Sequence, residues 1–441
     1  MKASRKSVLG IVFLTVFLDI VGFSVIFPLF PSMLDHYVGL EGQNSIVGRL
    51  AFNLDQFSGG DRNATITLFG GILGSIYGLL QFLSSALWGN LSDRWGRRPV
   101  LLLTLTGTAA ACLLWSFSGT FLTLVVARIL GGAMAGNISV ASAAVADSTP
   151  KDERAGGMGI VGMAIGLGFI CGPALGGAVP LINPIGDAVP KHLALNPFSF
   201  AALASFLLAL INLTWAIFRF PETCPRDTHE PKKHSSFNPF ARLRTLKVLG
   251  LQRVNLVYFL YLLAFAGAEF TLTFLAVERL EFSRTDLAWM FVAVGLVIAL
   301  VQGGLVRKIA PKVGERFLAQ AGLLLTIPGF LFIAGAETAT ALYAGLIFMA
   351  VGSAFAMPCF SALASLYAPV ENQGLALGAF RSMGSLARAT GPVLGALLYW
   401  KWGSGSPFFS GATFLALPLG LSLALPRPNT ATLHSQKEQS P

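Results

Sequence analysis

The sequence is poor in charge: only 12% of its 441 residues are Asp, Glu, Lys or Arg, while 54% are hydrophobic. An ordinary soluble domain carries about 25% charged residues, so a large soluble catalytic domain is excluded. The 48 glycines follow no collagen-like period and lie inside the apolar runs. That placement is typical of packed membrane helices.

Cysteine and histidine are also scarce, with four and five residues respectively. No C-x-x-C pair occurs, and every histidine lies outside the apolar segments. A disulfide framework and a zinc site are therefore not expected. Metalloprotease, Walker-loop and nucleophile-elbow motifs are absent as well, so we predict no enzyme activity, no metal and no cofactor.

Twelve apolar segments run along the chain, and each is close to the length of about 20 residues that crosses the hydrocarbon of a bilayer. They lie near residues 8–30, 67–88, 99–118, 121–146, 157–180, 197–218, 254–277, 287–306, 316–335, 339–363, 374–398 and 407–425. The first lacks an A-x-A cleavage site, which indicates a retained span rather than a signal peptide. We predict an all-α polytopic membrane protein with 12 transmembrane helices.

The formal net charge of +10 is unevenly distributed. Of the 31 Lys and Arg residues, 22 lie on one set of alternate loops and tails and six on the other set. The positive-inside rule places the richer set, which includes both termini, in the cytoplasm. The orientation of the chain in the membrane explains the positive net charge, so no nucleic-acid partner is expected.

A basic inside segment divides the chain into two halves. We predict an N-terminal six-helix bundle over residues 1–218, a linker over 219–253, a C-terminal six-helix bundle over 254–425 and a cytoplasmic tail over 426–441. The latter part of the linker fits either an amphipathic helix on the lipid headgroups or a solvated tether.

The outside segment over residues 31–66 is expected to be a loop because it is long and polar. It contains Asn63-Ala64-Thr65, an acceptor pattern for N-glycosylation on the side of the membrane where glycosylation takes place.

The two halves share a repeat. The fifth apolar segment carries Gly159, Gly172, Pro173, Leu175 and Gly176, and the eleventh carries the same residue types 219 residues later, at Gly378, Gly391, Pro392, Leu394 and Gly395. Internal repeats of this kind build secondary transporters, whose substrate site lies between the halves near the bilayer midplane. The repeat is the first indication of function.

The inside segment after the second span reads Gly89-Asn-Leu-Ser-Asp93-Arg94-Trp-Gly96-Arg97-Arg98-Pro99. It resembles the loop signature of the major facilitator superfamily. In that family the signature implies a latch on the cytoplasmic face, whose Asp and Arg side chains bridge helices and separate when the transporter changes state. Asp147, at the inside end of span four, is the expected partner of Arg97 or Arg98. In the second half Pro311 replaces Asp93, so that copy is degenerate.

Two further elements resemble members of the same family. Span four carries Arg128, within a variant of the family's Arg-x-x-Gln-Gly element in which Gly131 replaces the Gln. Gly172-Pro173-x-x-Gly176 in span five is similar to the element typical of antiporters. Proline and small residues there permit bending and close helix contact.

The first span places Gly22, Pro28 and Pro31 at spacings of three, nine and twelve residues from Asp19. Those spacings resemble the bacterial tetracycline efflux proteins of the drug:proton antiporter branch. Burial near mid-bilayer favours the neutral, protonated form of a carboxyl, which is what a proton carrier requires. Glu269 in span seven is a second membrane carboxyl.

The stretch around Glu269, together with the segment from Arg381 to Pro392, resembles the animal tetracycline transporter-like proteins. Arg381, Ser385 and Arg388 share one helix face. Counting the deep charges, Arg128, Arg381 and Arg388 outnumber Asp19 and Glu269, which favours an anionic or zwitterionic substrate. The alternatives are that an arginine pairs permanently with Glu269 or that it binds backbone carbonyls. Asn137 in span four is a lesser candidate for the substrate cavity.

The resemblance extends over almost the whole chain. It implies the major facilitator fold, with two pseudo-symmetric bundles, and export of an amphipathic organic compound or drug, tetracycline-like, by proton antiport with alternating access. Asp19 and Glu269 are the expected proton-coupling residues, and the expected partners are protons, the small organic substrate and membrane lipid, with the chain acting as a monomer.

Two other functions remain open. One is a facilitator or symporter of an endogenous organic anion or lysolipid-like amphiphile. The other is a non-coupled membrane protein that moves lipid or signals. The short loops and tails favour a bacterial inner (plasma) membrane over a eukaryotic organelle.

Overall fold

The structure is a computed structural model that describes residues 5–149, 154–178, 194–223, 249–368 and 373–427. All regular elements in these ranges are helical. The helices are α1 (Arg5–Ser24), η1 (Phe27–Leu29), α2 (Phe30–Glu41), α3 (Ile46–Ser58), α4 (Arg62–Trp95), α5 (Arg97–Ser116), α6 (Phe121–Met134), α7 (Asn137–Ser148), α8 (Arg154–Ala178), α9 (Ser199–Arg219), α11 (Leu249–Leu280), α12 (Arg284–Leu300), η5 (Val301–Val306), α13 (Arg307–Val313), α14 (Glu315–Ala334), α15 (Ala339–Tyr367), α16 (Gln373–Trp402), α17 (Ser406–Phe414) and α18 (Ala416–Leu423). The fold is that of an all-helical membrane protein.

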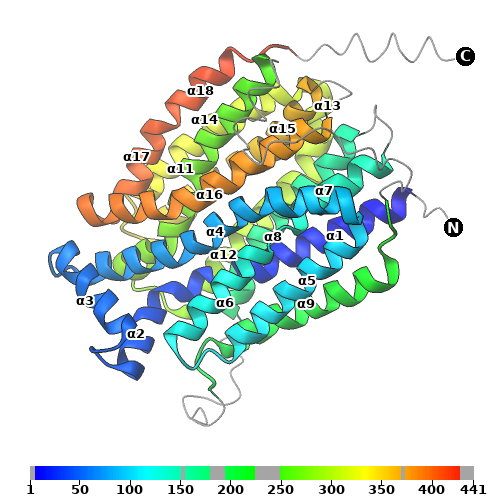
Figure 1. Ribbon diagram of the computed structural model, residues 1–441. Helices are drawn as coiled ribbons and strands as arrows, with labels where there is room; N and C mark the ends of the chain where they lie inside the picture. The colour runs from blue at the N-terminus through cyan, green and yellow to red at the C-terminus, as the bar shows by residue number, and fades with distance from the viewer. Residues whose placement is uncertain (1–4, 150–153, 179–193, 224–248, 369–372, 428–441) are drawn as a thin grey trace, which may run out of the picture.

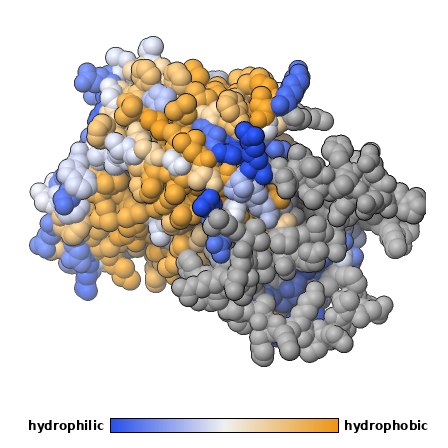
Figure 2. Space-filling model, turned by 90° about the horizontal axis from the view of Figure 1, so that it is seen from above, coloured by the Kyte–Doolittle hydropathy of each residue, from blue (hydrophilic) through white to orange (hydrophobic). Residues whose placement is uncertain are grey.

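The predicted spans correspond to long helical units that lie side by side (Figure 1). Among the described residues, 11 units are long and apolar enough to cross a membrane. Several are built from consecutive helices, such as Val8–Glu41 and Phe121–Val145. α16 has 30 residues and is long enough for a further span, although it is more polar than the others. Apolar residues cover much of the described surface seen in Figure 2, as lipid contact requires.

The prediction of a loop over residues 31–66 is wrong. α2 extends the first span to Glu41, and α3 fills most of the remainder. Local signals explain α3: the Ser45 side chain accepts a hydrogen bond from the Gly48 amide at the N-cap, and Gly59 ends the helix with φ +73°. Polar composition indicated exposure correctly but did not exclude a helix.

The segment from Gly89 to Pro99 is also more helical than expected. α4 continues through Trp95 and α5 begins at Arg97, so Gly96 alone interrupts the helices, with φ +99°. A residue without Cβ is favoured at such a φ. The predicted amphipathic part of the linker lies almost entirely within residues 224–248, outside the described ranges.

The sequence repeat has a structural counterpart. Gly172 of α8 packs directly on the backbone of α1 at Val21, and Gly176 packs on the backbone of Val25, the residue that follows α1. Gly391 and Gly395 of α16 pack in the same way on α11: a Cβ on Gly395 would lie 2.7 Å from the carbonyl oxygen of Gly267. Each repeated element therefore holds its helix against the first long helix of its own half. Pro173 lies inside α8.

We call α1–α9 the N half and α11–α18 the C half. α1 begins and α18 ends on one side of the bundle, the terminal side (Figure 1). Towards the other side the halves pack tightly. A Cβ on Gly71 of α4 would lie 3.0 Å from the Ala396 Cβ of α16, and one on Gly177 of α8 would lie 2.7 Å from the Ala288 Cα of α12. The small residues thus close the seam between the halves on that side.

Candidate functional site

The membrane carboxyl of α1 is held by a break in the fourth span. α6 ends at Met134 and α7 starts at Asn137, so the Asn137 side chain projects at the break. Its Nδ2 donates to Asp19 Oδ1 at 2.8 Å and lies 3.4 Å from Thr108 Oγ1 of α5. Asp19 is only 7% exposed. Asn137, a lesser candidate in the sequence, is therefore the direct partner of the carboxyl.

Asp19 and Arg128 line one small cavity, together with Phe23, Tyr77 and Thr108 among other residues. Its volume is about 30 Å³, which is room for a water molecule. The Asp19 carboxyl can exchange a proton with a water molecule in this cavity, while the Arg128 guanidinium keeps its charge and can bind a polar group.

Arg128 has no carboxylate partner within 4 Å among the described residues. Arg128 is 5% exposed, and its Nε and Nη2 have no hydrogen-bond partner in the part of the chain that the structure describes. The guanidinium instead lies 4.5 Å from the ring centre of Tyr77 and 5.5 Å from that of Phe23. These cation–π contacts offset part of the cost of burying the charge. Two nitrogens, with three N–H bonds between them, are therefore available to a ligand.

The C half contributes a second set of charges. The guanidinium of Arg388 stacks on Phe169 of α8, 3.7 Å from the ring centre. Glu269 of α11 is partly exposed, and no ion pair of 4 Å or less joins it to Arg388. Arg381 lies one heptad before Arg388 and has an unpartnered Nη2, while Ser385 is partly exposed between them. Within the described ranges, neither arginine is neutralised by a fixed salt bridge.

Aromatic rings connect the two sets of charges. The ring centres of Tyr77 and Phe23 are 4.3 Å apart, and those of Phe23 and Phe169 are 5.7 Å apart. With Arg128 on Tyr77 and Arg388 on Phe169, the contacts run without interruption from the N half to the C half. The sequence analysis missed these three rings, although Phe23 follows Asp19 by four residues and so shares its helix face.

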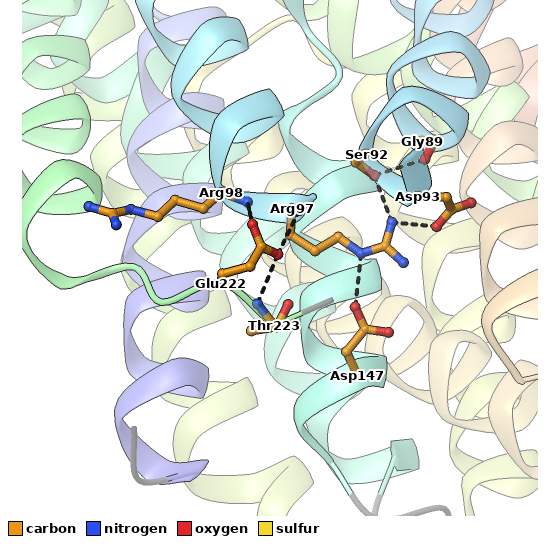
Figure 3. A network of polar contacts seen from close by, with 8 residues as sticks. All are labelled: Gly89, Ser92, Asp93, Arg97, Arg98, Asp147, Glu222 and Thr223. Carbon is orange, nitrogen blue, oxygen red and sulfur yellow. Dashed lines mark hydrogen bonds and ion pairs between the residues drawn. The ribbon is translucent and has the colours of Figure 1, made fainter. Parts of the chain in front are cut away.

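Two acids of the predicted latch, Asp93 and Asp147, meet at Arg97 (Figure 3). Its guanidinium bonds Asp93 at 2.5 Å, Asp147 at 2.8 Å and the Ser92 hydroxyl at 2.7 Å. The Arg97 side chain is 8% exposed, whereas that of Asp93 is 61% exposed. Arg97 thus ties α5 to α4 and α7, with Asp147 as the more buried partner.

The other signature residues lie around this ion pair. The Gly89 carbonyl accepts the Ser92 hydroxyl, and a Cβ on Gly89 would lie 2.9 Å from Ser139 Oγ of α7. The Arg98 side chain donates to the Ile217 carbonyl at the end of α9. Arg94 is exposed and takes no part in the network of Figure 3.

Glu222, which follows α9, was not expected here. Its carboxylate accepts hydrogen bonds from the Arg97 amide at 2.9 Å and the Arg98 amide at 3.2 Å (Figure 3). These are free N–H groups of the first turn of α5, where a negative charge is favourable. The segment that follows α9 is therefore hydrogen-bonded to the N-terminus of α5, next to the ion pairs of Arg97.

Gly96 leaves room for this carboxylate, since a Cβ there would lie 2.5 Å from Glu222 Oε2. We expect Gly96→Ala to lower the free energy of unfolding by about 1 to 3 kcal/mol more than Gly314→Ala, because Glu222 must release the two amides. Gly314 is a matched control, with φ +86° and nothing within 4 Å of its Cβ position. Chemical denaturation measures the two free energies of unfolding. In a Glu222→Ala background, the extra cost of Gly96→Ala over Gly314→Ala should disappear. Equal costs for the two glycines would contradict this explanation.

Comparison with known proteins identifies the family. Residues 12–319 and 309–440 match the profile of the Major Facilitator Superfamily. The chain belongs to that superfamily. Among curated relatives, the chain is 35% identical to major facilitator superfamily domain-containing protein 10 of Bos taurus, over 97% of this chain and 94% of that protein. It is 28% identical to the class D tetracycline resistance protein of Salmonella ordonez, over 93% of this chain and 95% of that protein.

Among solved structures, the human organic anion transporter MFSD10 (TETRAN) is similar to the chain, with a TM-score of 0.79 and 32% identity. The match covers 96% of this chain and 100% of that one. The relatives are transporters and not enzymes, as the sequence predicts. The chain is an integral, multi-pass membrane protein of the transporter class, and its substrate is a small organic molecule.

Proposed function

We propose that the chain exports an amphipathic organic anion or zwitterion in exchange for protons, by alternating access. One observation carries the proposal: Asp19 and Arg128 line a common cavity, and Arg128 has free N–H groups but no carboxylate partner in the described part of the chain. A proton on Asp19 would change the net charge of this cavity, and with it the attraction of the neighbouring arginines for an anion.

The substrate class is supported by the arrangement of the arginines. Arg128 and Arg388 stand at the two ends of the aromatic contacts, so a molecule with an anionic group and an apolar body can bind to both. One relative is named an organic anion transporter, and others are named tetracycline resistance proteins. Asn137, Arg381 and Ser385 complete the proposed substrate cavity.

Coupling to protons is assigned to Asp19 and Glu269. One proton that moves inward down a potential of 100 mV supplies about 2.3 kcal/mol. Alternating access then requires the halves to rock, with the network around Arg97 stabilising one state and Gly172-Pro173-x-x-Gly176 holding α8 on α1 during the movement. The domain boundaries at residues 218, 253 and 425 are part of this proposal.

The orientation also belongs to the proposal. The positive-inside rule puts the terminal side, with the latch, in the cytoplasm. We take the chain as a monomer.

The bacterial inner membrane stays a prediction from the short loops; the bovine relative, at 35% identity, weighs against it. The function requires only a membrane that maintains a proton gradient.

The direct test uses the purified full chain in liposomes and radiolabelled 4-phenylbutane-1-sulfonate. This amphipathic anion stays charged and does not carry protons through lipid. With a pH gradient imposed and no substrate gradient, we expect the sulfonate to accumulate on the acidic side, because each proton that leaves that side drives substrate towards it. A facilitator would equilibrate the probe without accumulation. Accumulation on the alkaline side would indicate symport. Either result would contradict antiport.

A further inference from the structure

The structure points to an oxyanion subsite on the terminal side of Arg388. We propose that Arg381, Ser361 and Gln302 bind the negative group of the substrate against the bare face of α8, at Gly162 and Gly166. This inference rests on the proposed function and names where the anion docks. The expected ligand is a singly charged carboxylate or sulfonate that carries an apolar body.

Three polar side chains from three elements of the C half converge on this face of the N half. A Cβ on Gly162 would lie 3.4 Å from Ser361 Oγ and 3.7 Å from Arg381 Nη2. A Cβ on Gly166, one turn further along α8, would lie 3.6 Å from Gln302 Nε2. The glycines have no side chains, so this face of α8 offers no side-chain group that could hydrogen bond to the three.

Each of the three carries a buried polar atom without a hydrogen-bond partner among the described residues: Arg381 Nη2, Ser361 Oγ and Gln302 Oε1. Ser361 is only 2% exposed. Buried polar atoms are nearly always bonded, and unbonded ones are costly. Three such atoms on one helix face indicate that a ligand completes the set. The Arg381 guanidinium and the Ser361 hydroxyl are suitable donors for an oxyanion, and Gln302 can donate through Nε2, which lies beside its unbonded acceptor Oε1.

The backbone around Gln302 supports a binding role. Gln302 lies in the π-helical segment Val301–Val306, between α12 and α13. Such segments are rare in helices and occur frequently at functional sites, because the extra residue per turn reorients a side chain. Here the segment carries Gln302, whose amide lies against Gly166.

The location links the subsite to the rest of the cavity. Arg381 and Arg388 are seven residues apart on α16, and their partners Gly162 and Phe169 are seven apart on α8. An amphipathic anion can therefore place its charged group at Arg381 and its apolar body at Phe169. Because the subsite is made of both halves, rocking of one half against the other would open it.

The test is isothermal titration of the purified full chain with 4-phenylbutane-1-sulfonate and with its neutral isostere, 4-phenylbutane-1-sulfonamide. We expect the sulfonate to bind at least about tenfold more tightly, since hydrogen bonds to charged groups are the stronger ones. Arg381→Gln should remove this preference, and Arg381→Lys should retain part of it. Ser361→Ala should weaken sulfonate binding by a few-fold. Ser382→Ala is the matched control because its hydroxyl bonds only its own helix, at the Gly378 carbonyl.

Two outcomes would overturn the subsite while the proposed function stands. Arg381→Gln could leave the preference for the sulfonate unchanged, with Arg128→Gln or Arg388→Gln removing it instead. Alternatively, added phosphatidylglycerol could displace the sulfonate, which would assign the site to a lipid headgroup. If the unaltered chain neither binds nor transports the sulfonate, the proposed function fails together with the subsite. Equal melting temperatures of Arg381→Gln and Arg381→Lys exclude misfolding as the cause.

Discussion

Asp19→Asn should abolish proton-driven accumulation of substrate while the protein still folds and binds. With the membrane potential held at zero, a pH gradient equivalent to 100 mV supplies about 2.3 kcal/mol per proton, enough for roughly 50-fold accumulation, and in the variant the ratio should fall to one. The reason is chemical. Asn cannot take up a proton at this position, yet its Oδ1 can still accept the hydrogen bond that Asn137 donates to Asp19 at 2.8 Å.

The control for this experiment is Asp35→Asn. Asp35 lies in α2, within the same long span, but it is exposed and pairs with Arg62 at the surface. Its neutralisation should leave accumulation unchanged. Glu269→Gln should reduce accumulation if both carboxyls carry protons. Survival of full accumulation in Asp19→Asn would remove this residue from the coupling mechanism. The absence of accumulation in every form of the protein, with or without Asp19, would favour the non-coupled lipid-moving or signalling alternative.

Arg97→Gln should have the second largest effect, through the balance between the two states of the transporter. Its guanidinium bonds Asp147, Asp93 and Ser92. Loss of a hydrogen bond to a charged group costs about 1.5 to 3 kcal/mol. Since Asp147 is the better buried acid, most of this cost should come from that pair. A change of about 2 to 3 kcal/mol shifts the ratio of the two states by roughly 30- to 150-fold.

The shift can be measured as the rate at which a thiol reagent reaches Cys112, which lines the Asp19 cavity. The experiment uses a variant in which the other three cysteines are serine, with reagent added to either side of sealed vesicles. Arg97→Gln should speed labelling from one side and slow it from the other. Asp93→Asn should have a smaller effect because the Asp93 side chain is 61% exposed and its ion pair is therefore weak. Equal effects of the two substitutions, or no effect of either, would argue against the latch.

The sequence was most informative about charged residues inside the apolar segments, because each of them indicates a functional role by itself. Asp19, Glu269, Arg128, Arg381 and Arg388 stand out because charge inside a membrane span is rare and functional. The repeated glycines likewise indicated close helix packing. In the structure the glycines of α8 pack against α1, and those of α16 pack against α11. In these cases the local sequence contains the whole signal.

Contacts between distant segments could not be read in this way. Nothing around Glu222 indicates that it caps α5, because the interaction joins positions 125 residues apart. Phe23, Tyr77 and Phe169 are three aromatic residues among many, and only the fold shows that they are in contact. Asn137 gained its importance from the helix break at Met134, which places it on Asp19. Hydropathy also misassigned residues 31–66, since an amphipathic helix and a loop are both polar on average.

The most direct test of proton exchange measures proton movement itself. Vesicles that contain the protein, 4-phenylbutane-1-sulfonate and a pH-sensitive dye are diluted into probe-free buffer of equal pH, with the membrane potential clamped at zero. If substrate and protons move in opposite directions, efflux of the sulfonate should acidify the lumen, and Asp19→Asn should abolish the acidification. Efflux with no pH change, or with the lumen turning alkaline, would contradict the account.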